Sequence, residues 1–157
     1  MRIVAALLIM LVAGCANQNE SMDRAELLDF AERYAAAWSG QDAAVWATFY
    51  TETGSLRVND GEPAVGREEL AALAQSYMTA LPDMAVRFDS LGGSDSRPQF
   101  HWTLIATNSG PGGNGNSIHI SGYEEWTMSE DGLIEQSLGH IDTAEYERQL
   151  AFGTNRQ

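Results

Sequence analysis

The order of hydrophobic patterns along the chain restricts its fold more than any other feature. Apolar residues recur at helical spacing over residues 23–38 and again over 67–80, so each segment carries one apolar stripe. From residue 84 onwards, strand-like segments alternate with glycine-rich or Asp-Gly turns. Helices followed by strands predict an α+β domain, with the helices on one face of a curved antiparallel sheet. If that sheet is bent enough, the space beneath the helices is a pocket.

Caps, glycines and prolines set the predicted ends of these elements. Asp23 and Glu26 have the spacing of a capping box, Ser39-Gly40 stops the first helix, and Pro82 ends the third. The predicted helices cover residues 23–38, 43–50, 67–80 and about 143–151, and the predicted strands cover residues 55–59, 84–91, 98–108, 117–128 and 133–141.

The first 15 residues have the pattern of a secretory signal that ends in a lipid attachment site. Arg2 precedes an apolar run over residues 3–13, and Val12-Ala13-Gly14-Cys15 contains the only cysteine of the chain. The run is shorter than the roughly 20 apolar residues of a permanent membrane span. The pattern resembles a bacterial lipobox, so we expect residues 1–14 to be a cleaved lipoprotein signal and Cys15 to be acylated. The alternative is an ordinary signal peptide with a chance cysteine.

The predicted cleavage divides the chain and places it in the cell. We expect residues 15–21 to be the acylated cysteine and a flexible tether, residues 22–152 to be the folded domain, and residues 153–157 to be a tail. We expect a lipid-anchored protein of the cell envelope, on its periplasmic face. Ala16 after the cysteine, rather than aspartate, favours the outer membrane if the organism has one.

Charge composition excludes several partners and chemistries. The formal net charge is −13, from 22 acidic residues against nine arginines, and the chain has no lysine. Such a surface repels nucleic acid and anionic lipid, so we expect no nucleic-acid partner, and membrane attachment through the acyl chains alone. The absence of lysine excludes Schiff-base chemistry.

Six local motifs follow one another in a fixed order. They are the aromatic pair 49–50, the Gly-Arg-Glu helix entry at 63–70, the Leu-Pro-Asp step at 81–84, the Trp-Thr strand at 102–110, the Asp-Gly turn at 131–134, and Asp142, eight residues after that turn and seven before Gln149-Leu150. Together they resemble the SnoaL-like polyketide cyclase family of the nuclear transport factor 2-like superfamily. The resemblance spans roughly residues 25–152, and it implies a cone-shaped α+β barrel whose sheet is covered by about three N-terminal helices, with a pocket inside.

Asp142 is the first candidate for catalysis. In the cyclases that the chain resembles, an aspartate at this place acts as general acid or base on an enolisable carbonyl substrate. A carboxylate at the wall of an apolar pocket has its pKa raised by desolvation, which suits that task. The structural alternative is that Asp142 only caps the last helix, because residues 142–145 have capping-box spacing.

Histidines are the next candidates, since imidazole is well matched to proton transfer near neutral pH. His140 lies two residues before Asp142, and His119 lies on a neighbouring predicted strand; otherwise both are half-exposed strand residues. The family's histidine in the Trp-Thr strand is Asn108 here, and Trp126-Thr127 stands where cyclases tend to carry another. These departures weaken a cyclase assignment in the strict sense.

Glu124 is the remaining catalytic candidate. Strand alternation places it on the same face as Gly122 and Trp126, towards the pocket. A buried carboxylate is costly unless it is paired. We therefore expect Glu124 to be either an acid/base or the partner of an arginine such as Arg57 or Arg87.

Aromatic side chains provide candidates for the pocket wall, although aromatics on apolar faces are often plain core. Half of them are expected to touch a cavity. The candidates are Trp38, Trp46, Tyr50, Tyr77, Phe88, Phe100, Trp102 and Trp126.

Cofactors are not indicated by the remaining motifs. The three histidines show no metal-ligand spacing, and the glycines at 110–115 follow no phosphate-binding pattern, so we expect neither a metal nor a cofactor. Three functions stay open: a cyclase, isomerase or dehydratase that acts on a small apolar or carbonyl-containing molecule, a lipoprotein that binds such a molecule without turnover, and a scaffold that forms a homodimer through its open sheet face.

Overall fold

The computed structural model describes residues 22–154, which contain four α-helices and six β-strands. The predicted signal peptide, the lipidation site Cys15, the tether up to residue 21 and residues 155–157 of the tail lie outside the described residues. The helices are α1 (Arg24–Ser39), α2 (Ala43–Ala47), α3 (Gly66–Ala80) and α4 (Thr143–Phe152). The strands are β1 (Tyr50–Val58), β2 (Ala64–Val65), β3 (Ala85–Ser94), β4 (Arg97–Thr107), β5 (Ser117–Met128) and β6 (Ile134–Ile141).

The strands form one mixed sheet in the order β2-β1-β6-β5-β4-β3. All neighbouring pairs are antiparallel except β1 and β6, which run parallel, whereas the strand pattern predicted a wholly antiparallel sheet. Strands β3 to β6 follow one another through direct connections, which impose antiparallel pairing. Between β1 and β6 the chain forms α3 and four further strands, so no hairpin fixes the relative direction of β1 and β6.

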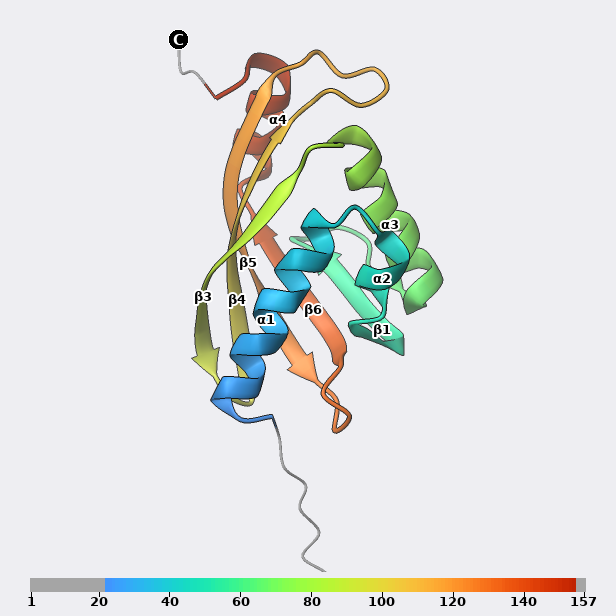
Figure 1. Cartoon of the computed structure of the whole chain (residues 1–157), viewed down its shortest axis with the longest axis vertical. Helices are drawn as coiled ribbons and strands as arrows, with labels where there is room; N and C mark the ends of the chain where they lie inside the picture. Colours follow the sequence, from blue (N-terminus) through green and yellow to red (C-terminus); the bar gives the residue numbers. More distant parts are fainter. Residues whose placement is uncertain (1–21, 155–157) are drawn as a thin grey trace, which may run out of the picture.

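Helices α1, α2 and α3 lie in the curve of this sheet, as Figure 1 shows, and α4 lies alongside β5 beyond the end of β6. The first helix begins at Asp23 with the predicted capping box, in which the Asp23 and Glu26 side chains each accept a backbone N–H of the other residue. Its apolar stripe, from Leu27 to Trp38, is buried against the sheet and the other helices. The predicted α+β architecture is therefore confirmed.

The segment that joins α2 to β1 differs from the sequence-based expectation. The second helix ends at Ala47 instead of continuing to residue 50, and β1 begins at Tyr50 instead of residue 55. Tyr50 pairs with Ile134 of β6, and the register shifts before Ser55. At Gly54 an added Cβ would lie 2.8 Å from the backbone oxygen of Ile134, so this irregular turn of the strand requires glycine.

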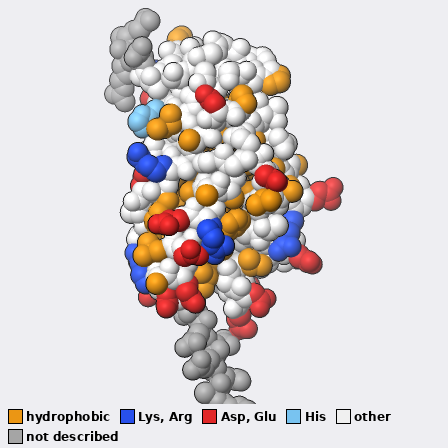
Figure 2. Space-filling model, in the orientation of Figure 1, with side chains coloured by type: hydrophobic (Ala, Val, Ile, Leu, Met, Phe, Trp, Pro, Cys, Tyr) orange, Lys and Arg blue, Asp and Glu red, His pale blue; other side chains and the backbone are white. Residues whose placement is uncertain are grey.

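Charged side chains gather over the lower half of the face drawn in Figure 2, where acidic and arginine side chains are interspersed with hydrophobic ones. The formal net charge of the whole chain, −13, is the reason for expecting no nucleic-acid partner, and this expectation stays a prediction.

Among residues 22–154, no helix has the length and apolar character needed to cross a bilayer.

Candidate ligand pocket

An apolar cavity of about 80 Å³ lies between the concave face of the sheet and the helices. Glu124 on β5 is the only residue with a charged side chain in its wall, as far as the described residues go. The wall is formed by Trp38, Leu56, Val58, Tyr77, Met84, Val86, Phe100, Trp102, Leu104, Ile120, Glu124, Gly139, Ile141 and Tyr146. This volume is well below the roughly 300–1,000 Å³ of pockets for drug-sized molecules, so the cavity has room only for a small molecule.

Glu124 is held by three hydrogen-bond donors that all address one of its oxygens. The Tyr34 hydroxyl donates to Oε2 over 3.0 Å, the Trp126 indole Nε1 over 3.1 Å and the Ser137 hydroxyl over 2.6 Å. The Tyr50 hydroxyl lies 2.8 Å from that of Tyr34 and extends the network. Glu124 is 6% exposed, and its second oxygen, Oε1, has no hydrogen-bond partner among the described residues.

Burial sets the protonation behaviour of this network. Desolvation raises the pKa of Glu124, and the hydrogen bonds from Ser137, Trp126 and Tyr34 oppose the rise without cancelling it. Burial, and next the nearby charge of Glu124, raise the pKa values of Tyr34 and Tyr50 well above the ordinary tyrosine range, so both stay protonated donors. The result is a carboxyl group with raised proton affinity in the wall of an apolar cavity.

The partners of Glu124 differ from the arginines that the sequence suggested. The inward orientation predicted from strand alternation agrees with its burial. The expected arginine partner was wrong: Arg87 is exposed and pairs with Asp89, and Arg57 is also exposed. Neutral hydroxyl and indole donors satisfy the carboxyl at lower desolvation cost than a buried guanidinium would.

Trp102 on β4 also lines the cavity. Its indole N–H is buried and has no hydrogen-bond partner within the described part of the chain. Trp102 pairs with Gly122 of β5, where an added Cβ would lie 2.7 Å from Trp102 Cζ2. The indole therefore crosses the strand at the one inward position of β5 that lacks a side chain.

The eight aromatic candidates divide evenly. Trp38, Tyr77, Phe100 and Trp102 line the cavity. The other four lie outside its wall and pack around it: Trp46 and Tyr50 against Tyr34, Phe88 stacked on Phe100, and Trp126 stacked on the same ring from another side.

A larger surface recess adjoins the cavity and shares part of its wall. Val58, Tyr77, Ile141 and Tyr146 belong to both. Charged residues Arg57, Asp60 and Glu147 lie only in the outer recess, together with His140. The tyrosines from α3 and α4 therefore stand between a polar entrance and the apolar interior.

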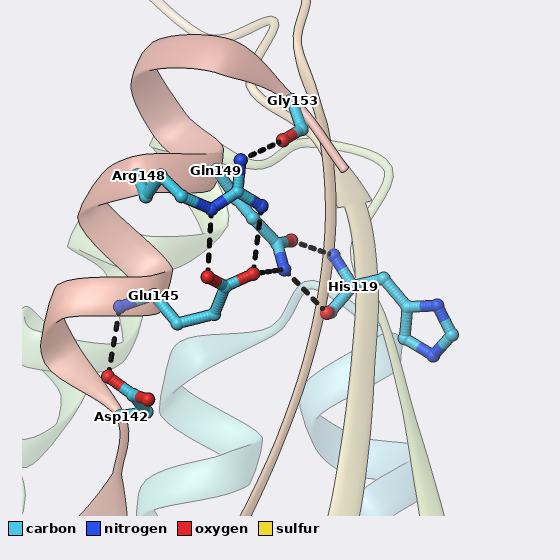
Figure 3. A network of polar contacts seen from close by, with 6 residues as sticks. All are labelled: His119, Asp142, Glu145, Arg148, Gln149 and Gly153. Atoms are coloured by element: carbon cyan, nitrogen blue, oxygen red, sulfur yellow. Dashed lines mark hydrogen bonds and ion pairs between the residues drawn. The ribbon is translucent and has the colours of Figure 1, made fainter. Parts of the chain in front are cut away.

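Asp142 occupies the capping position that was its structural alternative. Its carboxylate accepts the backbone N–H of Glu145 over 2.9 Å at the start of α4 (Figure 3). The residue is exposed and lies outside the walls of the cavity and of the recess. The capping contact explains the position of Asp142 without a catalytic role. Glu124 is the carboxyl group that lines the cavity.

His119 and His140 both lie on the outer face of the sheet. Figure 3 shows the His119 ring pointing away from the polar network, while Gln149 of α4 pairs with its backbone: Oε1 accepts the N–H over 2.6 Å and Nε2 donates to the carbonyl over 3.0 Å. His140 stacks on Tyr123 and lies 3.0 Å from Glu125 Oε1. Neither histidine reaches the inner cavity.

Sequence reasoning missed three groups of the site: Tyr34, Ser137 and the indole N–H of Trp102. Tyr34 and Ser137 sit at inward positions of their elements, but periodicity identifies only the face of a residue and not its partner. The paired polar residues come together from α1, β5 and β6, and α1 is about 90 residues away from the other two elements in the chain. Within residues 22–154, no three His, Cys, Asp or Glu side chains are arranged to hold a metal ion.

A curved sheet packed around helices and enclosing an apolar cavity defines a small domain of the α+β class. The SnoaL-like domain model matches residues 31–137, and the chain belongs to this family. The sequence shows no significant match to any curated protein.

Solved structures show the same fold at low sequence identity. AclR from Streptomyces galilaeus is 20% identical, with a TM-score of 0.70 over 82% of this chain and 98% of its own. A Catenulispora acidiphila protein with a ketosteroid isomerase-like fold, in complex with trimethylamine, is 12% identical, with a TM-score of 0.69 over 82% and 97%. The epoxide hydrolase/cyclase-like enzyme SalBIII, which has a role in pyran ring formation in salinomycin, is 14% identical, with a TM-score of 0.68 over 78% and 95%.

Proposed function

We propose that this protein binds a small, neutral, largely apolar carbonyl compound in the cavity and that Glu124 transfers protons to and from it. The observation that carries the proposal is the buried carboxyl in the cavity wall, with Oε2 taken by three donors. Oε1 is the oxygen left to exchange a proton with a ligand. A neutral ligand is favoured because an apolar wall cannot solvate a second charge.

Reactions of the cyclase, isomerase and dehydratase type share a step that one carboxyl group can perform. Glu124 Oε1 takes a proton from the carbon next to the carbonyl, and the electron pair of that C–H bond moves towards the carbonyl oxygen. The same proton then returns to another carbon, to an alkoxide formed on ring closure, or to a departing hydroxyl group. Raised proton affinity makes the carboxylate a stronger base than an exposed glutamate.

Hydrogen–deuterium exchange into cyclohexanone in D₂O tests this step without knowledge of the natural substrate. Wild-type domain should accelerate deuterium incorporation next to the carbonyl above the buffer rate, as measured by mass spectrometry. Glu124→Gln keeps an oxygen acceptor for the three donors but removes the base, and it should lower the protein-dependent rate about 100-fold or more.

Asp142→Asn is the matched control, because that residue is an exposed helix cap outside the cavity. It should leave the exchange rate unchanged. Loss of exchange in Asp142→Asn but not in Glu124→Gln would return the catalytic role to Asp142. Binding of cyclohexanone with no exchange above the buffer rate would leave a ligand-binding protein without catalysis.

The cellular setting is part of the same proposal. We propose that Cys15 is acylated and holds the domain on the periplasmic face of the cell envelope; the sequence pattern of residues 1–15 supports it. Metabolic labelling with an alkyne fatty acid should tag the wild-type chain and not Cys15→Ser. Equal labelling of both chains would contradict the anchor.

A further inference from the structure

The buried indole N–H of Trp102 is a hydrogen-bond donor with no partner among residues 22–154. Buried polar groups in folded proteins are nearly always paired, so each exception calls for an explanation. Trp102 lines the cavity, whereas Trp46, whose indole N–H is also buried without a partner, does not. The two tryptophans therefore differ in that only Trp102 forms part of the cavity wall.

Trp102 lies beside Gly122, the inward position of β5 that precedes Glu124. Trp102 Cζ2 lies over Gly122, and Nε1 is joined to Cζ2 through a single ring carbon, so both belong to one edge of the indole. Gly122 and Glu124 are successive inward positions of β5. The Trp102 indole and the Glu124 carboxyl group are therefore neighbours in the cavity wall.

Chemistry distinguishes the two groups. The indole N–H only donates a hydrogen bond, so its partner must be an acceptor. The ionised carboxylate accepts a proton at Oε1, because Oε2 already accepts three hydrogen bonds. An oxygen acceptor next to an acidic C–H bond matches both groups in one small molecule.

We infer that Trp102 is a catalytic and specificity-determining residue, whose indole N–H donates to the carbonyl oxygen of the ligand while Glu124 faces the neighbouring carbon. The inference rests on the proposed function. When Glu124 removes the proton from that carbon, the C–H electron pair forms the enolate double bond and the charge moves to the oxygen. The hydrogen bond from Trp102 then strengthens, because it becomes charge-assisted.

Two probes of nearly the same shape test the inference: cyclohexanone, and methylenecyclohexane, in which a CH₂ group replaces the oxygen. Both are titrated into ¹⁵N-labelled wild-type protein while the four indole N–H signals are recorded. The signal that is missing from the spectrum of Trp102→Phe identifies Trp102. Cyclohexanone should move the Trp102 proton downfield and should bind about fivefold to tenfold more tightly than methylenecyclohexane. The Trp46 signal is the internal control and should stay in place.

Variants add a kinetic readout. Trp102→Phe should bring the affinity ratio of the two probes close to one and slow deuterium exchange into cyclohexanone by about tenfold or more. Trp46→Phe, which removes the buried indole outside the cavity, should retain both the ratio and the rate. The shift measured on wild-type protein does not depend on whether either variant folds.

The outcomes separate this inference from the proposed function. Glu124-dependent exchange with an unmoved Trp102 signal, or with no preference for cyclohexanone, would overturn the role of Trp102 and leave the proposed function intact. Failure of both probes to bind would overturn both. Equal movement of the Trp46 and Trp102 signals would show a general structural change and would also overturn the inference.

Discussion

Replacing Glu124 by leucine should destabilise the protein far more than replacing it by glutamine. Leucine removes the shared acceptor of Tyr34, Trp126 and Ser137, which lie 3.0, 3.1 and 2.6 Å from Oε2. Tyr34 keeps its contact with Tyr50, but Trp126 Nε1 loses its acceptor and the Ser137 hydroxyl loses its short hydrogen bond, keeping only its contact with Tyr50. Each buried group left unpaired costs about 1–3 kcal/mol.

The expected loss for Glu124→Leu is therefore about 2–5 kcal/mol in the free energy of unfolding, because removal of the buried carboxyl offsets part of it. Against a typical total of about 5–15 kcal/mol, such a loss is easily measured by urea denaturation. Adding Ser137→Ala to Glu124→Leu removes a donor that has lost its carboxylate acceptor. The double variant should therefore be about 1 kcal/mol more stable than the sum of the two single losses in unfolding free energy predicts.

The pH dependence of the same experiment has a defined sign. Since burial raises the pKa of Glu124 in the folded state, the folded protein binds more protons than the unfolded chain between the ordinary glutamate pKa of about 4.3 and the raised one. Wild-type stability should fall as the pH rises through that window, relative to Glu124→Gln, and the two proteins should differ least below it. Glutamine and leucine variants of equal stability, or a wild-type advantage that grows with pH, would refute the reasoning.

Three further changes test the surroundings of the site. Gln149→Leu leaves the backbone N–H and carbonyl of His119 without their side-chain partner and should cost about 1–3 kcal/mol by urea denaturation; an unchanged stability would show that water replaces the amide. Gly122→Ala places a Cβ 2.6 Å from the backbone oxygen of residue 140 and 2.7 Å from Trp102 Cζ2, so it should cost about 1–3 kcal/mol or more and shift the Trp102 indole signal. Asp142→Ala removes the α4 cap and should cost about 0.5–2 kcal/mol without weakening cyclohexanone binding; a matching loss of binding would place Asp142 in the site.

Local signals predicted most of the fold because each acts over a few residues. The capping box at Asp23, the stop at Pro82 and the Asp-Gly turn at 131–132 fix the ends of elements independently of the rest of the chain. The prediction for residues 48–54 was wrong because Phe49 and Tyr50 suit either the end of a helix or a strand. Pairing of Tyr50 with β6, more than 80 residues away, decides between them.

The site was predictable only in outline. Strand alternation placed Glu124 inward, because that property depends on backbone geometry alone. The choice between Asp142 as cap and as pocket carboxylate depends on where β6 ends relative to the cavity, which spacing does not determine. The donors around Glu124 come from separate elements and carry no shared sequence signal.

Direct titration of the Glu124 carboxyl by ¹³C NMR, with and without cyclohexanone, tests the central claim most directly. Glu124 is expected to titrate above the ordinary glutamate pKa, since burial raises its pKa, and bound cyclohexanone should raise that pKa further by excluding the remaining water. A Glu124 signal that titrates with the exposed glutamates and does not respond to cyclohexanone would contradict a proton-transferring carboxyl in a ligand pocket.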